Sequence, residues 1–262
     1  MQLLAAIEPL YVLSGFLVGT LVGMTGVGGG SLMTPILVLL FHVHPATAVG
    51  TDLLFAAATK SVGTMMHGAS KTIDWRLVGL LAVGSVPGTA ATLGVLSFAD
   101  LSSPSAGKAL TIALAIVLLV TSTFLLCGRF LRARFIQNVR HFDESRVHLY
   151  TILLGVVMGV LVTSTSVGAG AIGVTVLLLL HPRMPIARIV GSDIAHAVPL
   201  TLAAGGGHWI LGSVNWGLLG TLLLGSIPGI MVGSYLATRA SDGVVRTALA
   251  ITLIAVAIKL LW

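Results

Sequence analysis

Long apolar runs separated by short polar connections make up almost the whole chain. A helix needs about 20 apolar residues to cross a bilayer. Each half of the chain contains three such runs after a longer apolar element, near residues 46–70, 76–97 and 108–128, and again near 187–211, 215–237 and 244–261. Pro45, Pro104 and Pro185 lie at or before the starts of runs, where proline is best tolerated in helices. The pattern predicts an all-α polytopic membrane protein.

The longer element that opens each half, about residues 10–42 and 148–181, is interrupted by glycines. The interruptions are GMTGVGGGSLMTP, from Gly23 to Pro35, and TSTSVGAGAIG, from Thr163 to Gly173. Clustered glycines break a helix. We therefore predict two helical arms of about 15 residues in each element. Such an arm is roughly 22 Å long, which is shorter than the roughly 30 Å hydrocarbon core.

The two halves repeat one another. A shift of about 140 residues superposes Gly15 on Gly155, and a shift of about 141 superposes Asp52 on Asp193. Further matches under these shifts include His67 with His208, Trp75 with Trp216, and GSVPG with GSIPG. This repetition predicts a first membrane repeat over residues 1–128, a basic cytoplasmic linker over 129–147 and a second membrane repeat over 148–262.

The loop charges favour a re-entrant path for the glycine-broken elements. If each element crosses the membrane once, loop Lys and Arg residues divide 8 against 5 between the two sides. If each element turns back at its glycines, the division becomes 11 against 2, with Lys108 and Lys259 outside. The second division agrees with the positive-inside rule. Each repeat would then be a re-entrant helical hairpin followed by three transmembrane helices, and the repeats would have inverted topology.

Composition narrows the function. The chain has 262 residues, of which 56% are hydrophobic and 8% charged, and this combination excludes a soluble domain. The formal charge of +6 comes from short loops, so it indicates topology rather than nucleic-acid binding. We find no nucleophile motif or cofactor fingerprint, and predict neither an enzyme nor a cofactor. His42, His44 and His67 leave a weak alternative, a metal-dependent membrane enzyme or assembly factor, but we assign no metal site.

The hairpin tips are candidate anion sites. Backbone groups freed by a helix break cannot face lipid, and bare N–H groups at the start of a half-helix attract anions. For Gly15, Gly19, Gly84 and Gly88 we instead favour close helix packing. The candidate ligands at the tips are Thr25, Gly28, Gly29, Gly30 and Ser31, and Thr163, Ser164, Thr165, Ser166, Gly168, Ala169 and Gly170.

Ionisable residues inside the predicted helices supply the other candidates. Asp52 and Asp193 lie about six residues into their runs, and an intramembrane carboxylate is a functional candidate by default. They are either proton carriers or helix N-terminal residues satisfied by backbone amides. Lys60 is either an anion ligand or the ion-pair partner of Asp52. The remaining candidates are Thr51 and Ser192 as ligands, and His196, His67 and His208 in coupling or gating, His67 and His208 being alternatively interfacial or hydrogen-bonding residues.

The first tip, ATAVGTD at Ala46 to Asp52, IDW at Ile73 to Trp75 and the GSVPG and GSIPG pair resemble the sulfite exporter TauE/SafE family. The resemblance covers nearly the whole chain. It implies a multi-pass transporter of the bacterial inner membrane for sulfite, organosulfonates or another small sulfur-containing anion. The expected partners are this anion, protons and the lipid bilayer, and the sequence leaves a homodimer open. The alternative is a channel or importer of a small anion with the same fold.

Overall fold

The computed structural model is all-α in the part of the chain that it describes, residues 9–25, 30–69, 71–139, 143–168, 170–237 and 242–262. The prediction of an all-α protein is therefore confirmed for these residues. The helices are α1 (Pro9–Thr25), α2 (Gly30–Leu39), α3 (Pro45–Ala69), α4 (Trp75–Ser97), α5 (Pro104–Val139), α6 (Glu144–Thr165), α7 (Ala171–Leu180), α8 (Ile186–Ile210), α9 (Trp216–Ala237) and α10 (Asp242–Leu261).

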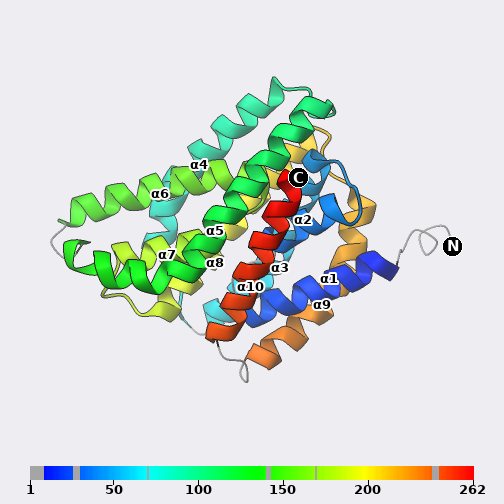
Figure 1. Cartoon of the computed structure of the whole chain (residues 1–262). Coiled ribbons are helices and arrows are strands. Elements are labelled where there is room, and N and C mark those ends of the chain that lie inside the picture. The colour runs from blue at the N-terminus through cyan, green and yellow to red at the C-terminus, as the bar shows by residue number, and fades with distance from the viewer. Residues whose placement is uncertain (1–8, 26–29, 70, 140–142, 169, 238–241) are drawn as a thin grey trace.

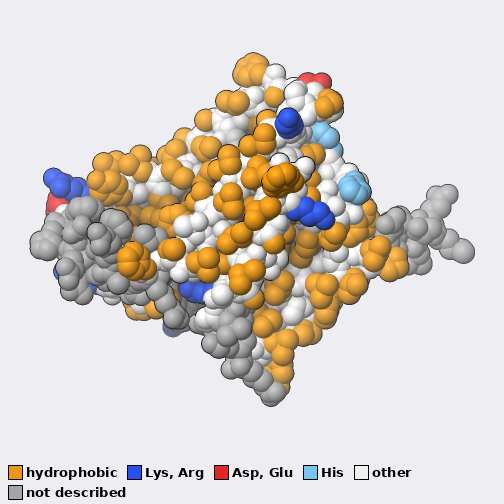
Figure 2. Space-filling model, viewed as in Figure 1, with side chains coloured by type: hydrophobic (Ala, Val, Ile, Leu, Met, Phe, Trp, Pro, Cys, Tyr) orange, Lys and Arg blue, Asp and Glu red, His pale blue; other side chains and the backbone are white. Residues whose placement is uncertain are grey.

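Five helices within the described residues are long and apolar enough to span a membrane: α4, α6, α8, the Pro104–Gly128 part of α5 and the Trp216–Gly233 part of α9. α3 is as long as α8 but less apolar. Figure 2 shows apolar side chains over most of the visible face, with few Lys and Arg side chains. Val95 and Met231, each 71% exposed, are examples of exposed apolar side chains. The protein is thus a multi-pass membrane protein.

Two helix boundaries differ from the predicted ones. α5 continues to Val139, so residues 129–139 of the predicted linker are helical, because this stretch lacks glycine and proline. α6 begins at Glu144, before the predicted start at residue 148. The proline positions agree with the prediction, since Pro45 and Pro104 are first residues of helices and Pro185 caps α8.

The two helical arms of each glycine-broken element are unequal, and the prediction of two arms of about 15 residues is wrong. The first arms, α1 and α6, have 17 and 22 residues, and the second arms, α2 and α7, have 10 each. α6 ends where Ser166 adopts φ 60°, a left-handed conformation typical of helix ends. Gly168 and Gly170 then have φ of 116° and 112°, which other residues rarely adopt. The second arm of each element is therefore shorter than the first, and the break lies past the middle of the element.

The first helix of each half packs against a helix of the other half. α1 packs on α9 and α6 packs on α4, and the two pairs lie at opposite ends of the molecule with α5 and α10 between them (Figure 1). A Cβ on Gly15 would overlap the Leu222 carbonyl, and one on Gly155 would overlap the Leu81 carbonyl. The same close approach occurs at Gly19 against Ser226, Gly84 against Ile152, Gly88 against Val156 and Gly225 against Val12. The predicted packing role of these glycines is confirmed, and α3 packs against α8 between the two pairs.

Candidate functional site

The buried ionisable side chains of the described residues all belong to α3 and α8. They are Asp52, Lys60, Asp193, His196 and His208, none more than 6% exposed. Inside a membrane protein such groups are costly, and they mark transport pathways or proton relays. Because α3 and α8 occupy matching places in the two halves, the contact between them is the candidate site.

Only one of the two carboxylate oxygens of Asp52 accepts hydrogen bonds from the described residues. Its Oδ2 accepts hydrogen bonds from Thr34 N at 3.2 Å and Thr34 Oγ1 at 2.5 Å, which ties α3 to the short arm α2. Its Oδ1 has no hydrogen-bond partner among the described residues. Ser166, from the break in the other half, lies near this carboxyl, and its Oγ is also unpartnered. The first carboxylate therefore faces polar atoms from both halves.

Asp193 is less constrained than Asp52. Its side chain is 1% exposed, and neither carboxylate oxygen has a hydrogen-bond partner among the described residues. A Cβ on Gly173, in the first turn of α7, would overlap Asp193 Oδ1, so the missing side chain makes room for the carboxylate. N–H groups in a first helical turn have no intrahelical acceptor. A buried, unpartnered carboxylate thus sits where the second half-helix begins.

Gly173 was missed as a site residue, although it ends the second glycine-rich stretch. We expect Gly173→Ala to destabilise the protein by about 1–3 kcal/mol, because the new methyl group meets Asp193 Oδ1 and lies 2.9 Å from Met158 Cε. Adding Asp193→Ala should recover part of this loss, since neighbouring substitutions are non-additive. Denaturant titration in detergent measures both. Gly206→Ala in α8 is the control, because that position faces open space, and equal losses at Gly173 and Gly206 would contradict the contact.

Lys60 supplies the positive charge of the site. Its ammonium group interacts electrostatically with Asp193 and, second, with Asp52. Among the described residues it makes no direct ion pair with either carboxylate. Lys60 thus interacts with both acids, and its role as an anion ligand or as the ion-pair partner of Asp52 stays a prediction. Its counterpart in the second half is Thr201, which bonds the Ala197 carbonyl.

His196 links α8 to the other half. Its Nε2 lies 2.8 Å from Ser85 Oγ of α4, and its Nδ1 has no partner among the described residues. The equivalent position in the first half is Phe55, and the Ser226 Oγ that matches Ser85 is unpartnered. The polar link therefore exists in one half only. Ser85 was missed because it lies 111 residues from its partner, a contact that no local pattern indicates.

His208 positions the second break. Its Nε2 donates to the Thr163 carbonyl at 2.9 Å, near the end of α6, and its Nδ1 is unpartnered among the described residues. This agrees with the hydrogen-bonding interpretation of the histidine. Its gating role stays a prediction. The structure places residue His67 in α3, but its side chain lies outside the described part.

Most candidate hydroxyls already bond protein groups. Thr51 Oγ1 accepts from Asn215 N at 3.1 Å, and Ser192 Oγ accepts from Asp74 N at 2.8 Å, two equivalent contacts between the halves. At the second break the bonds run from Thr163 to Thr89, Ser164 to the Val160 carbonyl and Thr165 to the Leu161 carbonyl, whereas the Ser166 hydroxyl lies next to the Asp52 carboxyl.

The remaining tip residues are only partly described. Ser31 is buried in the first turn of α2, and Gly168 and Gly170 shape the second break. Gly28, Gly29 and Ala169 lie outside the described residues. Thr25 ends α1 and Gly30 begins α2, and only their backbone is described. The described residues contain no group of three His, Cys, Asp or Glu side chains that could hold a metal ion.

Comparison with known proteins identifies the family. The model of the sulfite exporter TauE/SafE family matches residues 11–260. The chain belongs to this family. Among its relatives, the probable membrane transporter protein YjnA of Bacillus subtilis is 37% identical over 95% of this chain and 98% of its own length. The probable membrane transporter protein YdhB of Bacillus subtilis is 26% identical over 93% and 96%, respectively.

A further relative, the probable membrane transporter protein MJ0441 of Methanocaldococcus jannaschii, is 28% identical over 75% of this chain and 70% of its own length. No solved structure matches the chain significantly. The expected membership of the TauE/SafE family is thus confirmed, and the chain is a member of a membrane transporter family.

Proposed function

We propose that this TauE/SafE protein is a secondary transporter that exports a small sulfur-containing anion, such as sulfite or an organosulfonate, across the bacterial inner membrane by alternating access. One observation carries the proposal. Two buried carboxylates and one buried ammonium group lie where α3 and α8 meet the short arms of both hairpins. A packed membrane scaffold without transport has no need for these costly groups.

The path of the hairpins supports inverted repeats. The Tyr11 ring, near the start of α1, lies 4.4 Å from the Phe41 ring, just beyond α2. At the equivalent positions in the second half, Thr151 Oγ1 lies 3.1 Å from His181 Nε2. In each half the start of the hairpin thus meets its end, as expected if the chain leaves the membrane on the side that it entered. Three crossings then follow each hairpin, and an odd number inverts the second half.

The ligands fit a small oxyanion. Lys60 offers three N–H donors, and the breaks place the positive ends of the short helices near the carboxylates. Substrate sites in inverted-repeat transporters use half-helix ends in this manner. The exported anion would lie between Lys60 and the second break, where Ser166 Oγ is unpartnered.

The charges of the site couple binding of the anion to protonation of a carboxylate. With both carboxylates ionised, Asp52, Asp193 and Lys60 carry a net charge of −1, which repels an anion. Protonation of a carboxylate removes this repulsion. We therefore propose that the site takes up a proton when the anion binds, so that binding tightens as pH falls.

Thermal stability tests the proposal on detergent-purified protein. A ligand that binds the folded state raises the melting midpoint by mass action. We expect a rise with sulfite or an organosulfonate, larger at the lower of two pH values, and none with a carboxylate control. Thiosulfate, taurine and sulfate define the preferred head group. A rise with the carboxylate alone, or with none of these anions, would contradict a sulfur-anion site.

Lys60→Met should weaken anion binding at least about tenfold, since the only buried ammonium of the described site is lost while the side-chain length is kept. Lys259→Met, at the exposed end of α10, is the matched control. Titration of the anion against the melting midpoint measures both affinities. Unchanged affinity in Lys60→Met would place the anion elsewhere.

A further inference from the structure

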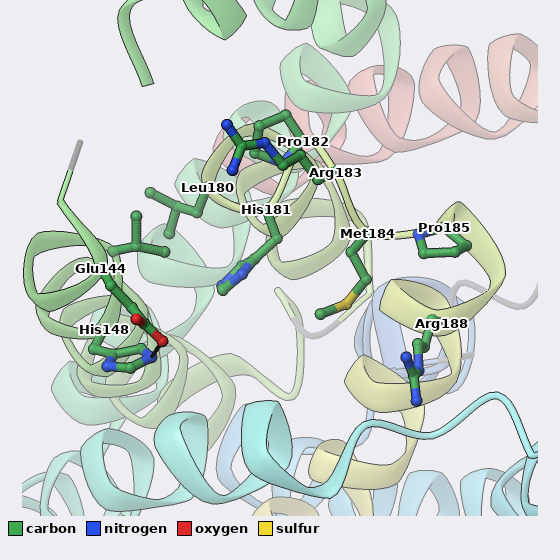
Figure 3. Close-up of a pocket in the computed structure, with 10 residues that line it drawn as sticks. Glu144, His148, Leu180, His181, Pro182, Arg183, Met184, Pro185 and Arg188 are labelled. Carbon is green, nitrogen blue, oxygen red and sulfur yellow. Dashed lines mark ion pairs between the residues drawn. The ribbon is translucent and has the colours of Figure 1, made fainter. Parts of the chain in front are cut away.

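An open cavity of about 530 Å³ lies at the mouth of the second hairpin. Its walls come from the start of α6, the end of α7 and the start of α8. Figure 3 shows His148 and Glu144 on one wall, Arg188 on the opposite wall, and His181 with Met184 between them. None of these residues takes part in the site on α3 and α8.

The cavity has an excess of positive charge. Glu144, its acidic residue, lies 3.8 Å from His148 Nε2. Burial, and next the neighbouring His148, lower the pKa of His181, whereas Asp74 raises it slightly. The His181 ring is therefore neutral near pH 7. Arg183 and Arg188 have no ion-pair partner among the described residues, so two guanidinium groups are available to an anion.

An apolar groove of about 450 Å³ adjoins the cavity, because Leu180 lines both. It is lined from α5 by Phe124, from α6 by Leu153, Val157 and Leu161, and from α7 by Val176 and Leu180. Tyr150 lies at its end nearest the cavity along α6. Tyr150 to Leu161 spans roughly 16 Å of helix, close to the thickness of one leaflet, about half of the roughly 30 Å core.

We propose that the cavity and the groove together bind one anionic phospholipid, with its head group in the cavity that Arg183 and Arg188 line and an acyl chain along α6 and α7. The leaflet is the one at which α6 begins. Basic pockets between membrane helices bind anionic lipid head groups in this way, and bidentate guanidinium contacts suit phosphate. A free anion fits the cavity but leaves the groove empty. The lipid would hold the short arm α7 against α5 and α6, and so stabilise the second hairpin.

The test uses the full chain in lipid nanodiscs made of phosphatidylcholine alone or of phosphatidylcholine mixed with phosphatidylglycerol. We expect phosphatidylglycerol to raise the melting midpoint and to remain bound in native mass spectrometry at least about tenfold more than phosphatidylcholine. Inorganic phosphate alone should not reproduce the rise. Equal behaviour of the two lipids would overturn the proposal, and a full rise with inorganic phosphate would assign the cavity to a free anion.

Two variants probe the two parts of the lipid. Arg183→Gln with Arg188→Gln should remove the preference for phosphatidylglycerol, and Val157→Trp, which fills the groove, should weaken binding of both lipids. Arg146→Gln is the control. Arg146 is an exposed cation in the first turn of α6, close in sequence to Glu144 and His148, but it does not line the cavity. Retention of the full preference in the double arginine variant would contradict the site, as would an equal loss in Arg146→Gln.

Discussion

Asp193→Asn is expected to lower net transport at least about a hundredfold, the effect of losing one essential proton-transferring group. The Asp193 carboxylate is buried, accepts no hydrogen bond within the described part of the chain, and interacts electrostatically with Lys60. Asparagine keeps the shape but cannot take up the proton that compensates the anion. Proteoliposomes with an imposed proton gradient measure the rate, with Asp100→Asn in an exposed loop as control. Wild-type transport in Asp193→Asn would remove the carboxylate from the mechanism.

Asp52→Asn separates the two acids. Asp52 Oδ2 accepts two hydrogen bonds from Thr34, and an amide oxygen accepts such bonds more weakly than a carboxylate, so this variant should lose some stability as well as transport. Asp193→Asn removes no hydrogen bond among the described residues, so its melting midpoint should stay near or above that of the wild type. A larger loss of stability in Asp193→Asn than in Asp52→Asn would contradict this division of roles.

Gly84→Val is expected to give the largest loss of folded protein. A Cβ at Gly84 in α4 would overlap the Ile152 carbonyl and lie 2.8 Å from Val156 N, both backbone atoms of α6 that cannot move aside. We expect a destabilisation of at least about 2 kcal/mol, seen as a lower melting midpoint and less monodisperse protein in size-exclusion chromatography.

The control lies in the same helix. Gly79 has no atom within 4 Å of its added Cβ, so Gly79→Val should leave stability nearly unchanged. Gly225→Val, the equivalent substitution at the contact of α9 with Val12 of α1, should reproduce the loss. Equal stability of Gly84→Val and Gly79→Val would contradict the close packing of α4 against α6.

The packing glycines could be predicted from the sequence, but their partners could not. The matches of Gly15 with Gly155 and of GSVPG with GSIPG indicate an internal repeat and close helix contacts. They do not indicate that α1 packs on α9 and α6 on α4, because periodicity along a uniformly apolar helix does not select one neighbour. The glycines likewise predict where the helix breaks, but they do not predict the unequal lengths of α6 and α7.

Only part of the candidate site could be predicted from the sequence. Asp52, Lys60 and Asp193 stand out because charged residues are rare inside apolar runs. Gly173 and Ser85 are ordinary residues of membrane helices, and only their positions opposite Asp193 and His196 give them a role. The sequence also presents the two aspartates as equivalent. Their hydrogen bonds differ, since Asp52 accepts from Thr34 whereas Asp193 has no hydrogen-bond partner among the described residues.

Counterflow is the most direct test of the central claim, that α3 and α8 form an alternating-access site for a sulfur-containing anion. Proteoliposomes loaded with unlabelled sulfite are diluted into a trace of radiolabelled sulfite without a proton gradient. We predict transient accumulation of label above its equilibrium level with the wild type, and none with Lys60→Met. A simple approach to equilibrium with the wild type would indicate a channel, and undiminished accumulation with Lys60→Met would place the substrate away from this site.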